Sequence, residues 1–352
     1  MTSVVRFGSR LVAAGFEVFD GERDARIWIS DDDRDWMIIT DPDLGGPGEQ
    51  TIWAMAEVGS GLVAVGTTGD SEDTDAAVWV STDGLDWARV PSPPSFGGRG
   101  HQAMNAISVV GGQIVAVGYD YTDAAVWTSG DGLAWSAVDD SAFGGDGEQK
   151  IWSLAVVEPG LIAVGEDDRD AAVWIFDGSA WAQIQDQTAF GGDGHQLMRD
   201  VTEFDGRLVA VGGAFLYEDI FFLGRGLGGT LDAMVWASED GLSWDRVDDE
   251  GGALGGVGEQ VMQRVVVWES SLLSVGYDLS GRGGVEEGLA PYGSGLDVDA
   301  AVWASDDGLA WTKVSSRAFG GEDWQDIWDI VVVPGEGVVA VGGDDLGTPT
   351  SN

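Results

Sequence analysis

Short apolar runs separated by polar turns recur along the whole chain and predict strands rather than helices. In residues 105–139 four such runs follow one another: NAISVV (105–110), QIVAVGY (113–119), DAAVWTS (123–129) and AWSAVD (134–139). They are rich in Val, Ile and Trp and are bounded by Gly, Asp and Ser, a composition typical of β-strands. The second run is apolar at nearly every position, which predicts a strand covered on both faces. Together the four runs predict one antiparallel sheet.

The same unit repeats, with a spacing of 48 residues from Trp79 to Trp127 and of 47 from Trp127 to Trp174. The third run of each unit ends in AVW or a close relative, and a second Trp follows seven or eight residues later. A repeat of this length made of short strands is typical of a β-propeller, in which each repeat forms one blade. The tryptophan pairs are Trp28 and Trp36, Trp79 and Trp87, Trp127 and Trp135, Trp174 and Trp181, Trp236 and Trp244, and Trp303 and Trp311.

We therefore expect an all-β fold: a β-propeller of four-stranded antiparallel blades in a single domain at 1–345, followed by a tail at 346–352. Six complete units and a seventh that stops after two strands favour seven blades with the last one incomplete. The alternative is six blades, which would require the first and last inner strands to occupy one position. The expected blade boundaries are 1–43, 44–95, 96–142, 143–189, 190–253, 254–318 and, for the partial unit, 319–345.

The turn between the third and fourth runs has the form Ser-x-Asp-Gly-x-x-Trp, as in STDGLDW (81–87), SGDGLAW (129–135), SEDGLSW (238–244) and SDDGLAW (305–311). We expect the Asp to accept hydrogen bonds from the following backbone amides, the Gly to adopt a positive φ, and the Trp to pack on the hairpin. The first copy, SDDDRDW, lacks the glycine, and the fourth, IFDGSAW, lacks the serine. The motif resembles the Asp-box, or BNR, repeat of sialidase-like and sortilin-type propellers, shortened by one residue. The resemblance implies a propeller fold, in which this motif is structural.

A glycine-rich linker joins the last strand of each unit to the first strand of the next, as in FGGDGEQ at 143–149. A phosphate-binding loop would lead into a helix N-terminus and would usually carry a lysine. Here the following residues are strand-like and the neighbours are acidic, so we interpret the segment as a tight connection. Its last residue is expected to satisfy backbone groups of the loop, and in successive copies it is Gln50, Gln102, Gln149, Gln196, Gln260 and Gln325.

The net charge of −44, from 61 acidic and 17 basic residues, narrows the range of partners. It argues against nucleic acid, because phosphate contacts need a basic surface, and against anionic membrane surfaces. No run reaches transmembrane length, so no membrane insertion is expected. The chain has no cysteine, which excludes disulfides and thiolate metal sites. The first residues do not form a signal peptide, so we expect either a cytoplasmic protein or one whose leader was removed, and we favour an extracellular or surface-associated location.

Candidate ligand-binding residues lie where each linker meets the next first strand. The residue before the linker glutamine could contribute to a ring of carboxylate and imidazole groups for a divalent cation or a polar ligand, or could bond within its own linker. In successive copies this residue is Glu49, His101, Glu148, His195, Glu259 and Trp324. Three residues after the glutamine, three tryptophans are candidates for lining a central channel: Trp53, Trp152 and Trp328.

No cofactor is expected, with calcium as the alternative. Each third strand opens with an aspartate that could bind calcium or cap its turn, and the sixfold repetition favours the capping role. These aspartates are Asp24, Asp75, Asp123, Asp170, Asp232 and Asp299.

Two insertions, at 214–231 and 278–296, lengthen the same loop in the fifth and sixth units. Repeat proteins concentrate binding specificity in such loops. The first insertion carries an apolar cluster that we expect to form either a cap or a contact patch for a partner. The cluster comprises Phe215, Leu216, Tyr217, Ile220, Phe221, Phe222 and Leu223.

These features favour a non-catalytic propeller that binds a protein or a glycan through the face carrying the insertions. The first alternative, implied by the family resemblance, is a sialidase-like glycoside hydrolase, which would use an arginine cluster, a tyrosine nucleophile and acidic residues. Its nearest matches here are Arg199, Arg264, Tyr119 and Tyr277, a constellation too thin to assign any catalytic residue. The second alternative is a structural component of an acidic surface assembly or particle.

Overall fold

The computed structural model describes residues 1–19, 21–70, 72–157, 160–192, 194–215, 232–249, 251–255, 260–278, 298–314, 319 and 325–344. They form the predicted all-β fold, with the four-stranded antiparallel blades of a β-propeller. The chain divides into two compact units. The first contains Met1–Asp168, Val173–Ile184 and Val333–Val341, and the second contains the described residues of Arg169–Ala172, Gln185–Val332 and Gly342–Asn352.

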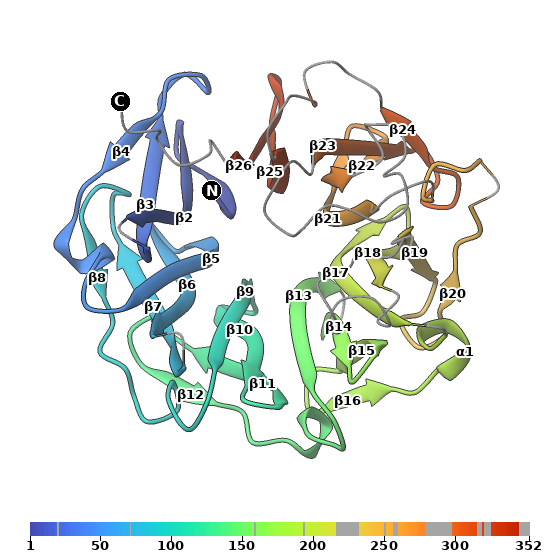
Figure 1. Cartoon of the computed structure of the whole chain (residues 1–352), viewed down its shortest axis with the longest axis horizontal. Coiled ribbons are helices and arrows are strands. Elements are labelled where there is room, and N and C mark those ends of the chain that lie inside the picture. The colour runs from blue at the N-terminus through green and yellow to red at the C-terminus, as the bar shows by residue number, and fades with distance from the viewer. Residues whose placement is uncertain are drawn as a thin grey trace, which may run out of the picture. The chain divides into compact units, whose positions relative to one another are not determined.

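In each of the first four blades the strands pair in chain order as an antiparallel meander (Figure 1). The strands of the first two blades are β1 (Ser3–Phe7), β2 (Arg10–Phe19), β3 (Glu22–Ser30), β4 (Met37–Ile39), β5 (Glu49–Val58), β6 (Gly61–Gly69), β7 (Thr74–Ser81) and β8 (Trp87–Arg89). Those of the next two are β9 (Gln102–Val110), β10 (Gln113–Asp120), β11 (Asp123–Ser129), β12 (Trp135–Ala137), β13 (Gln149–Val157), β14 (Gly160–Asp167), β15 (Asp170–Phe176) and β16 (Trp181–Ile184). Within the first unit, the first strands β1, β5, β9 and β13 contact one another in succession.

Two further blades and a two-stranded sheet follow along the chain. Their strands are β17 (His195–Phe204), β18 (Arg207–Phe215), β19 (Asp232–Ser238), β20 (Asp245–Arg246), β21 (Gln260–Trp268), β22 (Ser271–Asp278), β23 (Asp299–Ser305), β24 (Thr312–Val314), β25 (Gln325–Val333) and β26 (Gly337–Asp344). The described residues thus contain six four-stranded blades, the number of the alternative interpretation. The segment expected to begin a seventh blade forms the two-stranded sheet β25–β26.

Among the linker residues that the structure describes are three short helical turns that the strand pattern did not predict. They are η1 (Pro42–Leu44), η2 (Ser141–Phe143) and α1 (Gln187–Phe190), and each begins after an aspartate whose side chain accepts a backbone hydrogen bond. Among the described residues, no helix combines the length and the apolar character needed to cross a membrane. The glutamine that ends a linker fixes its backbone, as predicted: Gln50 Nε2 donates to the carbonyls of Pro47 (3.0 Å) and Gly48 (2.9 Å).

The second strand of a blade is apolar on both faces because a neighbouring blade covers each face. On β6, Leu62 belongs to a core shared with Val12 of the first blade, whereas the adjacent Val63 belongs to a core shared with Ile114 of the third. Successive side chains of a strand point to opposite faces, so one uninterrupted apolar run fills two cores. The sequence prediction of a doubly covered strand is therefore confirmed.

The Ser-x-Asp-Gly-x-x-Trp segments form the expected turn. Asp83 Oδ1 accepts hydrogen bonds from the backbone amides of Leu85 (2.8 Å) and Asp86 (3.0 Å), and Trp87 Nε1 donates to the Gly84 carbonyl (3.1 Å). Gly84 has a φ of 76°, which a side chain would strain. The same carboxylate bonds recur in three further turns, at Asp131, Asp240 and Asp307.

The first tryptophan of a pair connects its blade to the preceding linker. In five blades this indole is buried, as blade packing requires, and its Nε1 donates to a linker carbonyl. The five bonds run from Trp79 to Asp43 (2.9 Å), Trp127 to Ser95 (2.7 Å), Trp174 to Ala142 (2.8 Å), Trp236 to Ala189 (2.9 Å) and Trp303 to Ala253 (2.9 Å).

A β-bulge interrupts the first strand of five blades at the third residue after the linker glutamine. A bulge leaves one residue unpaired and bends the strand toward its partner. In the third blade this brings the Ala103 carbonyl oxygen within 1.9 Å of where a Cβ on Gly118 would lie, so only glycine fits there. This close approach explains the glycine that ends each LVAVG run. The bulged residues are Trp53, Asn105, Trp152, Arg199 and Gln263.

Replacing Gly118 with Ala should lower the free energy of unfolding by about 2–3 kcal/mol, because the paired strands must separate to admit a methyl group. Gly165→Ala should have a similar effect, since its Cβ would lie 1.9 Å from the Lys150 carbonyl oxygen. Gly130→Ala is the matched control, because no atom lies within 4 Å of its Cβ position. Urea unfolding followed by tryptophan fluorescence measures all three. Equal midpoints for G118A and G130A would contradict the explanation.

The turn carboxylates should make the stability of the fold depend on pH. Hydrogen bonds from the amides of Ala134 and Leu133 lower the pKa of Asp131. A group whose pKa is lower in the folded protein stabilises the fold above its unfolded pKa, about 3.9 for Asp, and loses this contribution as the pH falls through its folded pKa. Asp131→Asn should therefore lower the urea midpoint clearly near pH 6 and much less near pH 2.5. The exposed Asp139 supplies the control variant Asp139→Asn, and a pH-independent effect of D131N would refute this account.

Candidate functional site

The residues predicted to bind a ligand lie at one edge of their blades, where the first strand starts and the second strand ends. We call this the linker edge. In the fourth blade Gln149 pairs with Asp167, which puts Glu148 beside the loop between the second and third strands. Pairing of His195 with Phe215 repeats the arrangement in the fifth blade. The insertions at 214–231 and 278–296 follow β18 and β22, so they leave their blades at the linker edge.

The residues preceding the linker glutamines have local partners where the structure shows their contacts. His101 Nδ1 lies 3.2 Å from Thr74 Oγ1, and Glu148 Oε2 accepts a hydrogen bond from Lys150 Nζ at 2.8 Å. Glu49 and His195 begin β5 and β17 and are partly buried, while Glu259 and Trp324 lie outside the described residues. Among the residues that are described, no three His, Asp or Glu side chains group so that they could hold a metal ion. A shared ring of these groups stays a prediction.

Two of the three candidate tryptophans, Trp53 and Trp152, are the bulged residues of their strands. Each packs edge-on against an aromatic ring of the preceding blade. The Trp152 ring centre lies 6.5 Å from that of Tyr119, with 63° between the planes, and the Trp53 ring centre lies 6.2 Å from that of Phe16, at 68°. Both partner residues directly follow a second-strand glycine. Trp328 has the equivalent position in β25 and is partly buried.

One of the two lysines of the chain joins the pair formed by Tyr119 and Trp152. Lys150 Nζ lies 5.6 Å from the centre of the Tyr119 ring, 2.8 Å from Glu148 Oε2 and 3.9 Å from Glu166 Oε1. The Glu148 side chain is 61% exposed, whereas that of Glu166 is 7% exposed. We call these five residues the Trp152 cluster. It brings an indole, a phenol, a cation and an accessible carboxylate together at the linker edge.

The protonation states of the Trp152 cluster follow from its burial and charges. Burial raises the pKa of the Tyr119 phenol, and the charges of Glu148 and Glu166 add to the effect, while Lys150 opposes it. Burial would lower the pKa of Lys150, but the hydrogen bond to Glu148 and the charge of Glu166 outweigh burial and raise it. At neutral pH the site therefore presents a neutral phenol beside an ammonium cation. A raised pKa is the opposite of what an ionised tyrosine nucleophile needs.

Arg199 and Arg264 are the nearest matches to the arginine cluster of a sialidase. They lie on β17 and β21, the first strands of the fifth and sixth blades. Arg264 Nε lies 3.5 Å from Asp329 Oδ1, and Arg264 Nη1 lies 3.9 Å from Asp200 Oδ1 and 3.4 Å from the Arg199 carbonyl oxygen. Asp200 Oδ2 also accepts a hydrogen bond from the Val265 amide at 2.9 Å. The Arg264 guanidinium thus joins β17, β21 and β25 through carboxylates of the fold itself.

Sequence reasoning did not single out Lys150, Glu166 or the bulge as a positioning device. A signal was present in the repeat, because the third residue after the glutamine differs widely between copies, while the residue before it is apolar in all of them. Asn105 shows a second use of the bulged position: its Nδ2 donates to the Ile151 carbonyl at 2.8 Å and so holds the first strand of the next blade.

The apolar cluster predicted in the first insertion lies outside the described residues, except for the backbone of Phe215, which ends β18. Its members are Phe215, Leu216, Tyr217, Ile220, Phe221, Phe222 and Leu223. Their role as a partner contact stays a prediction.

Solved structures of other proteins share the fold of this chain. The structure of YjhT is similar over 89% of this chain and 96% of its own, with 12% identity and a TM-score of 0.52. A 6-phosphogluconolactonase-like protein from Bacteroides fragilis is similar over 96% of this chain and 88% of its own, with 11% identity and a TM-score of 0.52. The fold is a β-propeller. At these identities the propeller likeness extends to architecture alone.

A second 6-phosphogluconolactonase-like protein, from Bacteroides uniformis, has a TM-score of 0.51 at 10% identity and covers 94% of this chain and 88% of its own. The sequence matches no protein-family model and no curated protein. The propeller therefore supplies the scaffold, and any function must be argued from the side chains that it positions.

Removing the Lys150 ammonium should destabilise the propeller through its effect on Glu166. In Lys150→Met the nearly buried Glu166 carboxylate loses the ammonium group that lies 3.9 Å from it, which should cost about 1–2 kcal/mol near pH 7. Lys150→Arg keeps the charge and serves as the control, and adding Glu166→Gln to Lys150→Met should recover stability. Urea unfolding at pH 7 measures these variants; an equal loss in Lys150→Met with and without Glu166→Gln would count against the ion pair.

Proposed function

We propose that the protein is a non-catalytic binding module that recognises a glycan at the linker edge of its blades. The Trp152 cluster is the observation that carries the proposal. Sugar rings offer apolar C–H faces that pack on an indole, and hydroxyl groups that bond to carboxylates and ammonium groups. Trp152 and Tyr119 supply the first kind of contact, and Glu148 and Lys150 supply the second.

A related arrangement at the junction of the first and second blades, two junctions earlier in the first unit, supports the proposal. Trp53 packs on Phe16, and the guanidinium carbon of Arg23 lies 4.8 Å from the Phe16 ring centre. An aromatic pair with an adjacent cation therefore occurs twice within this unit. Equivalent positions of a repeat protein commonly present similar groups to an extended ligand. We accordingly expect two subsites of modest affinity, with no cofactor involved.

Two observations weigh against the alternative of a sialidase-like hydrolase. Arg264, the best-placed arginine, already contacts Asp200 and Asp329. Tyr119, the tyrosine nearest to a candidate site, has a raised pKa. Binding without catalysis is the function that these groups support best.

A protein partner at the insertions is the second candidate function. Strands β18 and β22 bring both insertions to the linker edge of their blades, the edge at which ligand candidates also lie. This shared edge is the observation in its favour. Binding of a protein partner there is compatible with glycan binding, because the two insertions belong to different blades from those that form the Trp152 cluster.

Trp152→Ala should weaken binding to the best ligand of an immobilised oligosaccharide panel by about tenfold or more, because the aromatic platform is lost. Trp152→Phe should retain part of the affinity. Leu133→Ala is the control, since Leu133 is 60% exposed in the Ser-x-Asp-Gly turn, at the opposite edge of the third blade. Surface plasmon resonance measures the affinities. No saturable binding to any glycan, or unchanged affinity of W152A, would overturn the proposal, and release of sialic acid from sialosides would overturn its non-catalytic part.

A further inference from the structure

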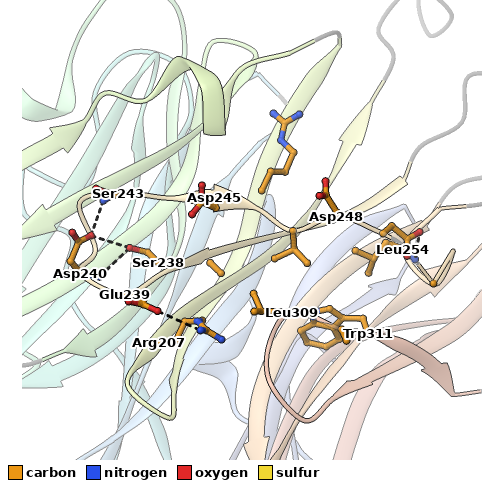
Figure 2. A pocket seen from close by; sticks show the side chains of 16 residues that line it. Arg207, Ser238, Glu239, Asp240, Ser243, Asp245, Asp248, Leu254, Leu309 and Trp311 are labelled. Atoms are coloured by element: carbon orange, nitrogen blue, oxygen red, sulfur yellow. Dashed lines mark hydrogen bonds and ion pairs between the residues drawn. The ribbon is translucent and has the colours of Figure 1, made fainter.

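A hollow of about 680 Å³ lies between the fifth and sixth blades, entirely within the second unit (Figure 2). Its apolar lining includes Val247 and Leu254 from the end of the fifth blade, and Leu309 and Trp311 from the sixth. We call it the Trp311 hollow. It lies beside the Ser-x-Asp-Gly turns of the fifth and sixth blades, and none of its lining residues belongs to the Trp152 cluster.

Comparison of the repeats explains why a hollow forms at this junction. In two other linkers a phenylalanine packs against the second tryptophan of the next blade: the Phe96 ring centre is 6.3 Å from that of Trp135, and the Phe143 ring centre is 5.5 Å from that of Trp181. The corresponding residue here is Leu254, which has no ring. It also follows its fourth-strand tryptophan by ten residues, whereas Phe143 follows its own by eight. A smaller anchor on a longer linker leaves space unfilled.

Most charged groups around the Trp311 hollow are engaged within the fold. Arg207 Nη2 lies 3.5 Å from Glu239 Oε1, and Arg246 donates to linker carbonyl groups. The carboxylates of Asp240 and Asp249 accept hydrogen bonds from backbone amides. These residues shape the hollow and have little capacity left for a further partner.

Asp245 and Asp248 differ from these residues. Both are exposed, and neither side chain forms a hydrogen bond or an ion pair with the residues that the structure describes. Figure 2 shows them on one side of the hollow, with Leu309 and Trp311 on the other. An occupant that suits both sides needs a cationic head for the carboxylates and an apolar stem for the indole and leucine.

We propose that the Trp311 hollow binds an arginine side chain presented by a basic peptide segment of a partner protein. A guanidinium group can form two parallel hydrogen bonds with a carboxylate and tolerates contact with an aromatic ring better than an ammonium group does. Its aliphatic stem gains by packing against Leu254 and Leu309. The net charge of −44 attracts a basic partner over long range, and the hollow provides a specific binding site for its arginine side chain.

The test uses the full chain and acetyl-Ala-Arg-Ala amide, with acetyl-Ala-Gln-Ala amide as the uncharged reference, by isothermal titration in 150 mM salt. Asp245→Asn with Asp248→Asn should weaken binding of the arginine peptide at least about tenfold. The charge-matched control is Asp86→Asn with Asp139→Asn, two exposed aspartates on other blades, and it should change the affinity less than about twofold. Equal losses in both double variants would show general attraction to an acidic surface and would overturn the proposal.

Leu254→Phe tests the hollow without changing any charge. Phenylalanine occupies this place in other linkers, so the variant should fold, fill the space beside Trp311 and abolish binding of the arginine peptide. Undiminished binding by a folded L254F would also overturn the proposal. If L254F fails to fold, the two aspartate double variants test the proposal without it. Glycan binding should be the same in all these variants, which separates this inference from the proposed function.

Discussion

The fold depends on strands that are apolar on both faces. In the second blade, the second strand places Leu62 in the core shared with the first blade and Val63 in the core shared with the third, so this blade alone would leave both faces of the strand in water. Stability must therefore come from the contacts between consecutive blades as much as from the hydrogen bonds within one. The first tryptophan of a pair, such as Trp79, reinforces those contacts. Its indole is buried in a core, and its Nε1 donates a hydrogen bond to the linker that precedes its blade.

The same constraint explains where variation is tolerated. Positions that fill cores are nearly invariant from copy to copy, whereas the bulged position of the first strand is Trp, Asn, Arg or Gln. The bulge takes this residue out of the regular ladder and so releases it from the alternation of buried and exposed sites. At this position Asn105 donates a hydrogen bond to the first strand of the following blade, whereas Trp152 packs against Tyr119 and forms an aromatic site.

Linkers provide a second kind of variation. Their anchor residue must reach the tryptophan of the next blade, and the phenylalanines at 96 and 143 do so by ring contact. Where the anchor is Leu254, a hollow opens beside Trp311 and the nearby aspartates gain an apolar neighbour. Comparison among copies within one chain thus separates residues that maintain the scaffold from those that give one junction a distinct chemistry.

The sequence by itself determined the fold class, the six complete blades and the strands within them, because each of these depends on local pattern and on turn residues. Strand β9 begins at Gln102, three residues before the predicted run at 105, since Gln102 pairs with Asp120 across the sheet. Only the tertiary structure decided the bulges, the meeting of Lys150 with Tyr119, and the space left by Leu254 beside Trp311. These features arise where two strands or two blades meet, because side chains that are far apart in the sequence pack together there. The periodicity of a single strand carries no information about which distant side chains it will contact.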